Sequence, residues 1–281
     1  MPNWYVSRER LRDALGYAAS DTGDDRLIAQ VIESVSRQID AYCNRHFYPR
    51  EQVRYFTPGN SSCVFIDDLL SASSVRTDSS GGREYGTTLA TTDYELAPAN
   101  ASAEDPGRAY WRLERIASST ASFPLAGRAL RIGGRWGYYD QRRESSGTIA
   151  AALGATDTAA SFSASGLVQT GETLLVDQEQ IFVEGLSTSD GKVATLRRGV
   201  NGSTPASHAA SATFGIYEYP MVSAAALQQA AMDLRAKDAP MGQVGSDVIG
   251  SQGFGAQVLL SGGLHPFVRR ALWPLRRLQA G

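Results

Sequence analysis

The residues with the greatest potential for chemistry are three histidines, His46, His208 and His265. An imidazole acts as a general base or a metal ligand when a nucleophile, a carboxylate or further ligands surround it. His46 follows an amphipathic segment, His208 lies in a turn rich in Ser and Ala, and His265 precedes a short helical segment. The sequence around each of them lacks a nucleophile or metal-ligand motif. The histidines therefore favour neither catalysis nor a metal centre.

Two adjacent acids, Asp67 and Asp68, follow the apolar run "VFI" and could hold a divalent cation. Acids at a strand end more often form a solvated turn, and no second acidic motif accompanies this pair. The sequence contains no Walker motif, and "GFGAQV" (253–258) lacks the spacing of a dinucleotide loop. We therefore expect a protein that is not an enzyme and that binds no cofactor or metal.

The two cysteines, Cys43 and Cys63, do not indicate a disulfide framework. Cys43 falls on the apolar face of a predicted helix, so a reduced and buried thiol is expected there. No apolar run approaches the roughly 20 residues needed to cross a bilayer, and the N-terminus lacks the layout of a signal peptide. These features predict a protein made in a cytoplasm, without membrane contact.

Helical patterns occupy the N-terminal region 7–46. Ser7 is placed to cap "RERLRDAL", which ends at Gly16. A second helix is predicted from about residue 24 to 44, with Asp24 and Asp25 where the helix dipole favours acids. Its apolar residues recur at helical spacing: Leu27, Ile28, Val31, Ile32, Val35, Ile39 and Tyr42.

The pattern changes to short strands over residues 51–143. Runs rich in aromatic and branched residues alternate with Gly, Pro, Asn and Ser, which is typical of antiparallel sheets. These runs are "EQVRYF", "CVFIDDL", "SVRTD", "DYELAP", "YWRLERI" and "RALRIGGRWGY". The segment "DSSGGREYG" (78–86) is predicted to form a hairpin loop.

Residues 146–218 differ in composition from the rest of the chain. They begin with a long uncharged stretch of small residues, and "ETLLVD", "EQIFVEGLS", "KVATLRRG" and "TFGIYEY" then indicate successive strands. The segment holds seven acids and three bases, a net charge of −4, whereas the whole chain has −2. This shift predicts a small all-β domain inserted into a parent domain formed by 1–145 and 219–281.

Helical signals return in the C-terminal region. A helix is predicted over 221–237 and is followed by a docking arm, 240–281, whose residues 242–263 include seven glycines. Pro266 begins a last helix, which Pro274 must kink or end. The predicted fold is α+β, with helical N- and C-terminal segments around an antiparallel β-sheet core and the inserted β domain.

Several segments, in this order, resemble the head–tail connector (adaptor) proteins of tailed bacteriophages. The resemblance covers about 1–143 and 220–281 and is carried by "YVSRERLRDALG", "DDRLIAQVIESVSRQIDAYCNRHFYP", "FIDDLLSASSVRTD", "TTDYELAPANA", "YWRLERI", "FPLAGRALRIGGRWGY" and "AALQQAAMDLRAKDAPMGQVGS". The insert is a departure, because a minimal adaptor lacks it. Its "DQEQIFVEG" and "RRGVNGSTPASHAASA" are similar to small β modules of phage tail and appendage proteins.

The resemblance implies a structural virion protein at the neck, the head–tail junction. Adaptors form a ring, typically dodecameric, beneath the portal protein. The ring extends the DNA channel, through which packaged DNA passes without sequence-specific binding, and it gives the stopper or tail-completion protein a surface for assembly. A ring requires that one face of each copy meet a different face of the next.

The end of the chain carries four arginines and no acid within "HPFVRRALWPLRRLQAG" (265–281). One hypothesis is that this tail docks on the portal. Two alternatives are that it faces DNA, because arginines attract phosphate, and that it packs on its own subunit. The residues predicted to dock are Phe267, Arg269, Arg270, Leu272, Trp273, Arg276 and Arg277.

Two other functions stay open at this point. The chain could be a different neck protein, either a stopper or a tail-completion protein. It could also be a phage appendage that recognises a glycan or receptor through residues 146–218, whose Ser, Thr and Asn loops would permit this. The aromatic residues of that segment, however, fit a core better than a binding platform.

Overall fold

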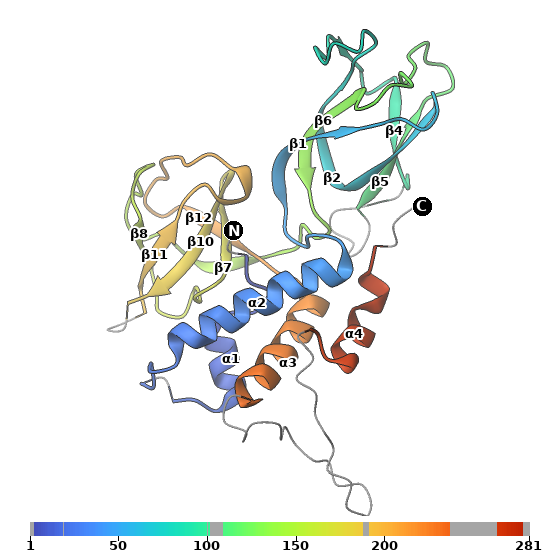
Figure 1. Cartoon of the computed structure of the whole chain (residues 1–281). Helices are drawn as coiled ribbons and strands as arrows, with labels where there is room; N and C mark the ends of the chain where they lie inside the picture. Colours follow the sequence, from blue (N-terminus) through green and yellow to red (C-terminus); the bar gives the residue numbers. More distant parts are fainter. Residues whose placement is uncertain are drawn as a thin grey trace, which may run out of the picture.

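The computed structural model describes residues 3–18, 20–99, 101, 109–187, 191–236 and 263–277. These residues form an α+β fold with two antiparallel sheets and four α-helices (Figure 1). The predicted α+β class is therefore confirmed. Most of the predicted docking arm, residues 240–262, lies outside the described residues. Within the ranges above, no helix has the length and apolar content required to span a bilayer.

The helices follow the capping and periodicity signals of the sequence. Their bounds are α1 Arg8–Leu15, α2 Asp25–Cys43, α3 Pro220–Ala236 and α4 Pro266–Leu272, with a 3₁₀ turn η2 at Trp273–Leu275. The Ser7 hydroxyl accepts a hydrogen bond from the Arg10 amide at 3.3 Å, and Gly16 ends α1 with a φ of 76°. Both predicted caps of α1 are thus confirmed.

The predicted apolar face of α2 is buried, and it includes Cys43 at 0% exposure. Cys43 is a free thiol, and burial raises its pKa to about 12. The expectation of a reduced and buried cysteine is confirmed. Such a thiol remains protonated and unreactive at neutral pH.

The first sheet has the order β1-β6-β2-β5-β4, and the short β3 pairs with β2. Its strands are β1 Arg50–Phe56, β2 Cys63–Thr77, β3 Thr87–Thr88, β4 Tyr94–Ala97, β5 Tyr110–Arg115 and β6 Leu130–Trp136. The loop predicted over 78–86 connects β2 to β3 and is confirmed. The prediction of two strands in "CVFIDDLLSASSVRTD" is wrong, because both runs belong to β2. The register shifts of β2 against β5 and β6 show that bulges bend this one strand.

The second sheet has the order β7-β12-β9-β10-β11-β8. Its strands are β7 Arg142–Thr148, β8 Ala159–Ser161, β9 Thr173–Val176, β10 Glu179–Leu186, β11 Val193–Arg197 and β12 Thr213–Tyr217. The sheet therefore begins before the predicted start of the insert at 146. The long turn 199–212 contains a 3₁₀ turn, η1 (Val200–Gly202), and a bridge between Leu153 and His208.

The buried apolar side chains of the described residues form three separate cores. One lies within each β unit, and the third gathers the helices with aromatic residues such as Tyr5 and Phe47. Figure 1 shows the four helices together on one side, with the second sheet above the start of α2 and the first sheet above its end. The helices therefore pack mainly on one another, and they bring both ends of the chain into a single core.

A buried polar network joins the N-terminus to the two β units. The side-chain amide of Asn3 donates to Asn201 at 2.6 Å, and that of Asn201 donates to Gln180 at 2.8 Å. Gln180 in turn donates to the carbonyl of Pro49, which precedes β1, at 3.2 Å. Buried amides that lose such partners cost free energy, so this chain of bonds fixes the second sheet against the first.

Gly202 provides a sensitive test of this junction. Its φ is +87°, and a Cβ at this position would lie 2.2 Å from the backbone oxygen of Glu51. Gly202→Ala is expected to lower the free energy of unfolding by about 3 kcal/mol, because it combines left-handed strain with overpacking against rigid backbone. Denaturant unfolding of the purified protein measures the loss.

Gly166→Ala is the matched control for this prediction. Gly166 also has a positive φ, +73°, but no described atom lies within 4 Å of a Cβ built there. Only the conformational cost of about 1 kcal/mol remains. Equal losses in the two variants would show that the approach of Gly202 to Glu51 contributes nothing.

Candidate docking site at the C-terminal segment

The segment 263–277 is held on the helical core by one buried stripe. Pro266 occupies the first turn of α4, and the ring nitrogen Nδ1 of His265 accepts from the Phe267 amide at 3.3 Å. The side-chain oxygen of Gln229 in α3 accepts from the His265 amide at 2.8 Å. The side chains of Val268 and Leu272 are fully buried against the other helices. The predicted start at Pro266 and the end of the α-helix before Pro274 are both confirmed.

Arg277 ties the end of this segment to α2 and β2. Its amide donates to the carbonyl of Cys43 at 2.8 Å. Its guanidinium contacts the carboxylate of Asp67 at 2.6 Å and donates to the carbonyl of Ile66 at 2.8 Å. A bidentate anchor of this kind fixes both the position and the direction of the tail.

The outer side of the segment presents large aromatic and basic side chains. Phe267 is 60% exposed and Trp273 is 59% exposed. Arg269, Arg270 and Arg276 are exposed beside them, and the Arg276 guanidinium lies 5.8 Å from the Trp273 ring centroid. We call these five residues the α4 surface. It carries no acid, so it is an apolar and cationic patch on a protein whose net charge is −2.

The structure thus separates the seven predicted docking residues into two groups. The five residues of the α4 surface are available to a partner. Leu272 is 0% exposed and belongs to the helical core, and Arg277 belongs to the internal anchor. The surroundings of these two residues do not support the docking role that the sequence suggested for them.

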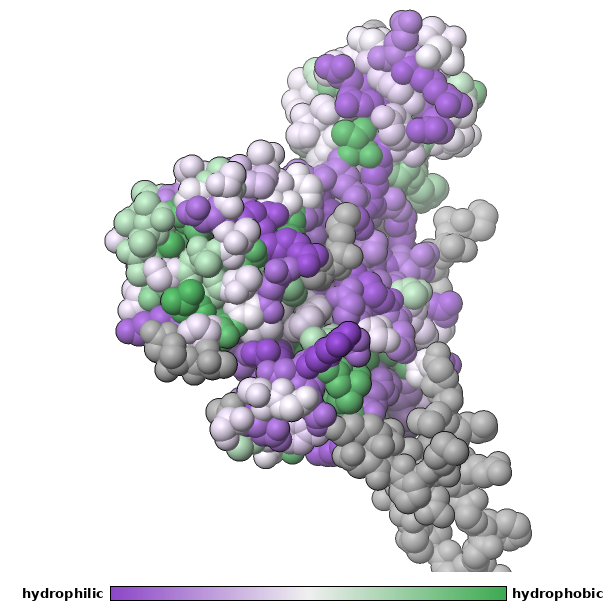
Figure 2. All heavy atoms as spheres, turned by 60° about the vertical axis from the view of Figure 1, so that its left-hand side comes forward, coloured by the Kyte–Doolittle hydropathy of each residue, from purple (hydrophilic) through white to green (hydrophobic). Residues whose placement is uncertain are grey.

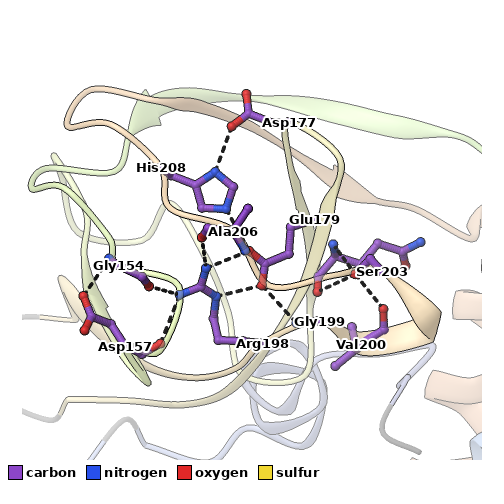
Figure 3. A network of polar contacts seen from close by, with 11 residues as sticks. Gly154, Asp157, Asp177, Glu179, Arg198, Gly199, Val200, Ser203, Ala206 and His208 are labelled. Carbon is purple, nitrogen blue, oxygen red and sulfur yellow. Dashed lines mark hydrogen bonds and ion pairs between the residues drawn. The ribbon is translucent and has the colours of Figure 1, made fainter.

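His208 lies in a closed polar network of the second β unit (Figure 3). Its Nδ1 contacts Asp177 at 2.8 Å, and its Nε2 contacts Glu179 at 2.8 Å. Arg198 approaches the same Glu179 carboxylate with two nitrogens, at 2.8 and 2.6 Å. Burial raises the pKa of Glu179, but these hydrogen bonds outweigh it, so the pKa lies below its ordinary value of 4.5.

Backbone groups complete the network around Glu179 and Arg198. The amides of Gly199 and Ala206 donate to the Glu179 carboxylate at 2.9 and 3.0 Å. The Arg198 guanidinium also donates to the carbonyls of Gly154 and Ala206, at 2.7 and 2.6 Å. One ion pair therefore fastens the loop before β8 and the long turn before β12 to the sheet.

This network offers no position for a substrate. The side chains of Glu179 and His208 are 0% exposed, and that of Arg198 is 6% exposed. The carboxylate oxygens already accept hydrogen bonds from side chains and backbone, so the arrangement stabilises loops. Sequence patterns do not predict this network, because Glu179 and Arg198 come together through the antiparallel pairing of β10 with β11. The sequence signals for this network are the charged runs "DQE" (177–179) and "RRG" (197–199), which contain the ion-pair partners.

Asp67 and Asp68 lie within β2, and both have arginine partners. Asp67 contacts Arg54 at 2.9 Å and Arg277 at 2.6 Å, and Asp68 contacts Arg45 at 3.4 Å. The expected solvated turn at a strand end is therefore wrong. Burial raises the pKa of Asp68, although the nearby arginines oppose the shift. In the described part of the chain, no group of three or more His, Cys, Asp or Glu residues is arranged to hold a metal ion.

No family model matches this chain, and neither a curated protein nor a solved structure is significantly similar to it. Its function must therefore be inferred from its own residues and their geometry. The α4 surface combines two large exposed aromatic rings with three exposed arginines.

The anchor of this surface gives a prediction for Arg277→Gln. Asp67 keeps Arg54 as a partner, so the variant removes the anchor without leaving a carboxylate unpaired. We expect the local stability of α4 to fall by about 1 kcal/mol, which makes amide hydrogen exchange in 263–277 about fivefold faster. Arg270→Gln, at an exposed position of the same helix, should leave the exchange rate unchanged. Equal rates in both variants would contradict the anchoring role.

Proposed function

We propose that this protein is a structural component of the phage neck, a head–tail adaptor that forms a ring beneath the portal. In this role the α4 surface docks on the portal, and the assembled ring extends the DNA channel and receives the stopper or tail. The proposed work is mechanical, so it involves no catalysed reaction, cofactor or membrane.

The single observation that carries the proposal is the exposure of Phe267 in α4 and Trp273 in η2, on a segment that is otherwise firmly held. Aromatic and arginine side chains supply much of the binding energy at protein interfaces. The two large rings expose apolar surface to water in a monomer, which is unfavourable in free energy. Contact of these rings and the three exposed arginines with an acidic or carbonyl-rich partner offsets that cost. A surface already held in place also loses little conformational entropy on binding.

The chain path supports reading 146–218 as an inserted module within a parent domain formed by 1–145 and 219–281. The chain enters the second sheet through β7 and leaves through β12, and these strands pair, with Arg142 opposite Tyr217. Neighbouring entry and exit strands are expected of a domain inserted between two parts of another. The helices before and after the module share one core, which fits helical N- and C-terminal segments of one parent domain.

Exposed apolar residues on the β units offer faces for contact between copies. On the first sheet Val53, Tyr55, Phe65 and Trp111 are 41–57% exposed, and the Phe65 and Trp111 rings are stacked 5.8 Å apart. Figure 2 shows further hydrophobic residues over the second β unit, whereas hydrophilic residues line the seam between the units. Two different faces of this kind are what a ring of identical subunits requires.

DNA is the rival partner for the α4 surface, because three exposed arginines would attract phosphate. Phosphate contacts by all three predict a log–log slope of affinity against salt of about −3. Under the proposal, a variant in which the exposed Arg269, Arg270 and Arg276 are all replaced by glutamine retains whatever DNA affinity the full chain has and binds the portal more weakly. A variant that loses DNA affinity and still binds the portal as tightly would reverse the assignment.

The oligomeric state provides the first test of the proposal. Native mass spectrometry of the full chain, alone and mixed with its portal, should reveal a closed oligomer of many copies on the portal. Subunits that remain solitary in both samples would exclude an adaptor ring. A closed oligomer that forms but ignores the portal would instead favour another neck protein or an appendage.

A further inference from the structure

A cavity of about 480 Å³ lies where the end of α2 meets β1, β2 and the C-terminal tail. This volume is within the usual range for sites that bind small molecules. None of the five residues of the α4 surface lines the cavity, and among the described residues of the tail, 263–277, Arg277 does.

Four arginines form the basic part of the cavity lining. The guanidinium groups of Arg37, Arg45, Arg54 and Arg277 line it together with the imidazole of His46. Arg45 is held in place by stacking on Tyr138, with its Cζ 4.2 Å from the ring centroid. Guanidinium groups that are fixed in position lose little entropy when they bind an oxyanion.

Three carboxylates, Asp40, Asp67 and Asp68, share the same walls. Asp67 has both Arg54 and Arg277 as partners, at 2.9 and 2.6 Å. With four guanidiniums against three carboxylates, the lining keeps an excess of positive charge even when His46 is neutral. Burial lowers the pKa of Arg54 and raises that of Asp68, so both groups are poorly solvated where they lie.

Two nitrogen atoms of the cavity have no well-formed hydrogen bond among the described residues, the Nε of Arg45 and the Nδ1 of His46. Arg37 is already engaged, because its guanidinium lies 3.0 Å from the Oδ2 of Asp40 and its Nε lies 3.6 Å from Glu33. The Nε of Arg45 lies 3.4 Å from the nearest oxygen of Asp68, and the Nδ1 of His46 lies 3.4 Å from Asp40. Buried polar groups are nearly always paired, so two nitrogens of one cavity that lack a well-formed hydrogen bond call for an acceptor.

We propose that this cavity binds one compact oxyanion, a phosphate or a carboxylate, through Arg45 and His46. A tetrahedral or planar oxyanion offers several acceptors at short range and adds the negative charge that the lining lacks. The three wall carboxylates disfavour a polyanionic strand such as DNA, because its neighbouring phosphates would lie close to them. The ligand is therefore a single small anion or one acidic side chain of a partner protein.

A ligand in the cavity would also act on the C-terminal segment, because of where the cavity lies. Arg277 both lines the cavity and anchors the tail on Asp67. An anion near Arg277 competes with Asp67 for the guanidinium or reinforces its position, so ligand binding is coupled to the segment that carries the α4 surface. This inference stands whether or not the protein is an adaptor.

Calorimetric titration of the full chain with inorganic phosphate and, separately, with acetate tests the proposal. We expect saturable binding of at least one of these anions. Arg45→Lys keeps a charge beside Asp68 but removes the Nε donor, and it is expected to weaken binding about tenfold. His46→Gln, at a half-exposed position that tolerates change more easily, should also weaken binding severalfold.

Arg26→Gln is the matched control, because Arg26 is exposed at the opposite end of α2. The anion affinity of the Arg26→Gln variant should equal that of the unchanged protein. Three results would overturn the proposal: no saturable binding of either anion, equal affinity in all variants, or displacement of the anion by a short DNA duplex bound at the same site. Phosphate bound more tightly than acetate would assign the site to free or esterified phosphate, and the reverse would assign it to an acidic side chain.

Discussion

Glu179→Ala is expected to lower the free energy of unfolding of the second β unit by about 3–5 kcal/mol. The substitution leaves Arg198 almost fully buried without its counter-charge and removes the shared acceptor of the loops. A loss of this size is a large fraction of the stability of a small domain. Hydrogen exchange resolved over 142–217, together with denaturant unfolding, measures it.

Glu184→Ala provides the control on the same strand. Glu184 pairs with Arg197, but the two side chains are 33% and 56% exposed. Exposed ion pairs contribute little, so a change below about 1 kcal/mol is expected. If Glu179→Ala lowers the free energy of unfolding by no more than this control, the network does not stabilise the second β unit.

The same network predicts how stability depends on pH. The pKa of Glu179 is lowered from 4.5 in the folded protein, so its ionised form is favoured by folding. Its contribution is fully present above pH 4.5 and is lost as the pH falls through the lower, folded value. Glu179→Gln should remove this part of the acid sensitivity. An unchanged acid profile would contradict the depressed pKa.

If the protein docks on the portal as proposed, replacing Phe267 and Trp273 together by alanine is expected to weaken that binding by about 100-fold or more. Each ring is a candidate hot spot worth about 2 kcal/mol, and a loss of 1.4 kcal/mol corresponds to a factor of ten. Both side chains are about 60% exposed, so the fold should keep its stability within about 0.5 kcal/mol. Surface-based binding measurements with immobilised portal give the affinity ratio.

The matched control replaces two exposed apolar residues elsewhere. Leu125, in the first β unit, is 67% exposed, and Val193, in the second, is 40% exposed. Leu125→Ala with Val193→Ala should leave portal affinity unchanged. If both double variants bind equally well, the α4 surface is not the docking site.

Local signals predicted the helices well because their determinants are contained in one turn of chain. Ser7 and Gly16 cap α1 as expected, and the apolar repeat of α2 corresponds to its buried face. The bent strand β2 was predicted as two strands, because the small residues Ser71, Ala72 and Ser73 interrupt its pattern of branched and aromatic residues. The register shifts that carry one strand through this stretch depend on its pairing with β6, which a local pattern cannot reveal.

The candidate site was predicted in part for the same reason. The composition of the sequence identified an aromatic and basic tail, and five of the seven predicted docking residues are exposed in the structure. Burial of Leu272 depends on α4 packing against α2 and α3, and Arg277 finds Asp67 across 210 positions of sequence. The network of His208 with Glu179 likewise requires tertiary pairing. Sequence composition can therefore identify a segment, but packing decides which of its side chains face outward.

Cryo-electron microscopy of the protein mixed with its portal tests the proposed ring most directly. We expect a closed ring of identical subunits, coaxial with the portal, in which Phe267 and Trp273 of each copy lie at the contact between the two proteins. The opposite result would be subunits that stay dispersed beside bare portals, or density on intact virions at the distal tail or shell and none at the head–tail junction.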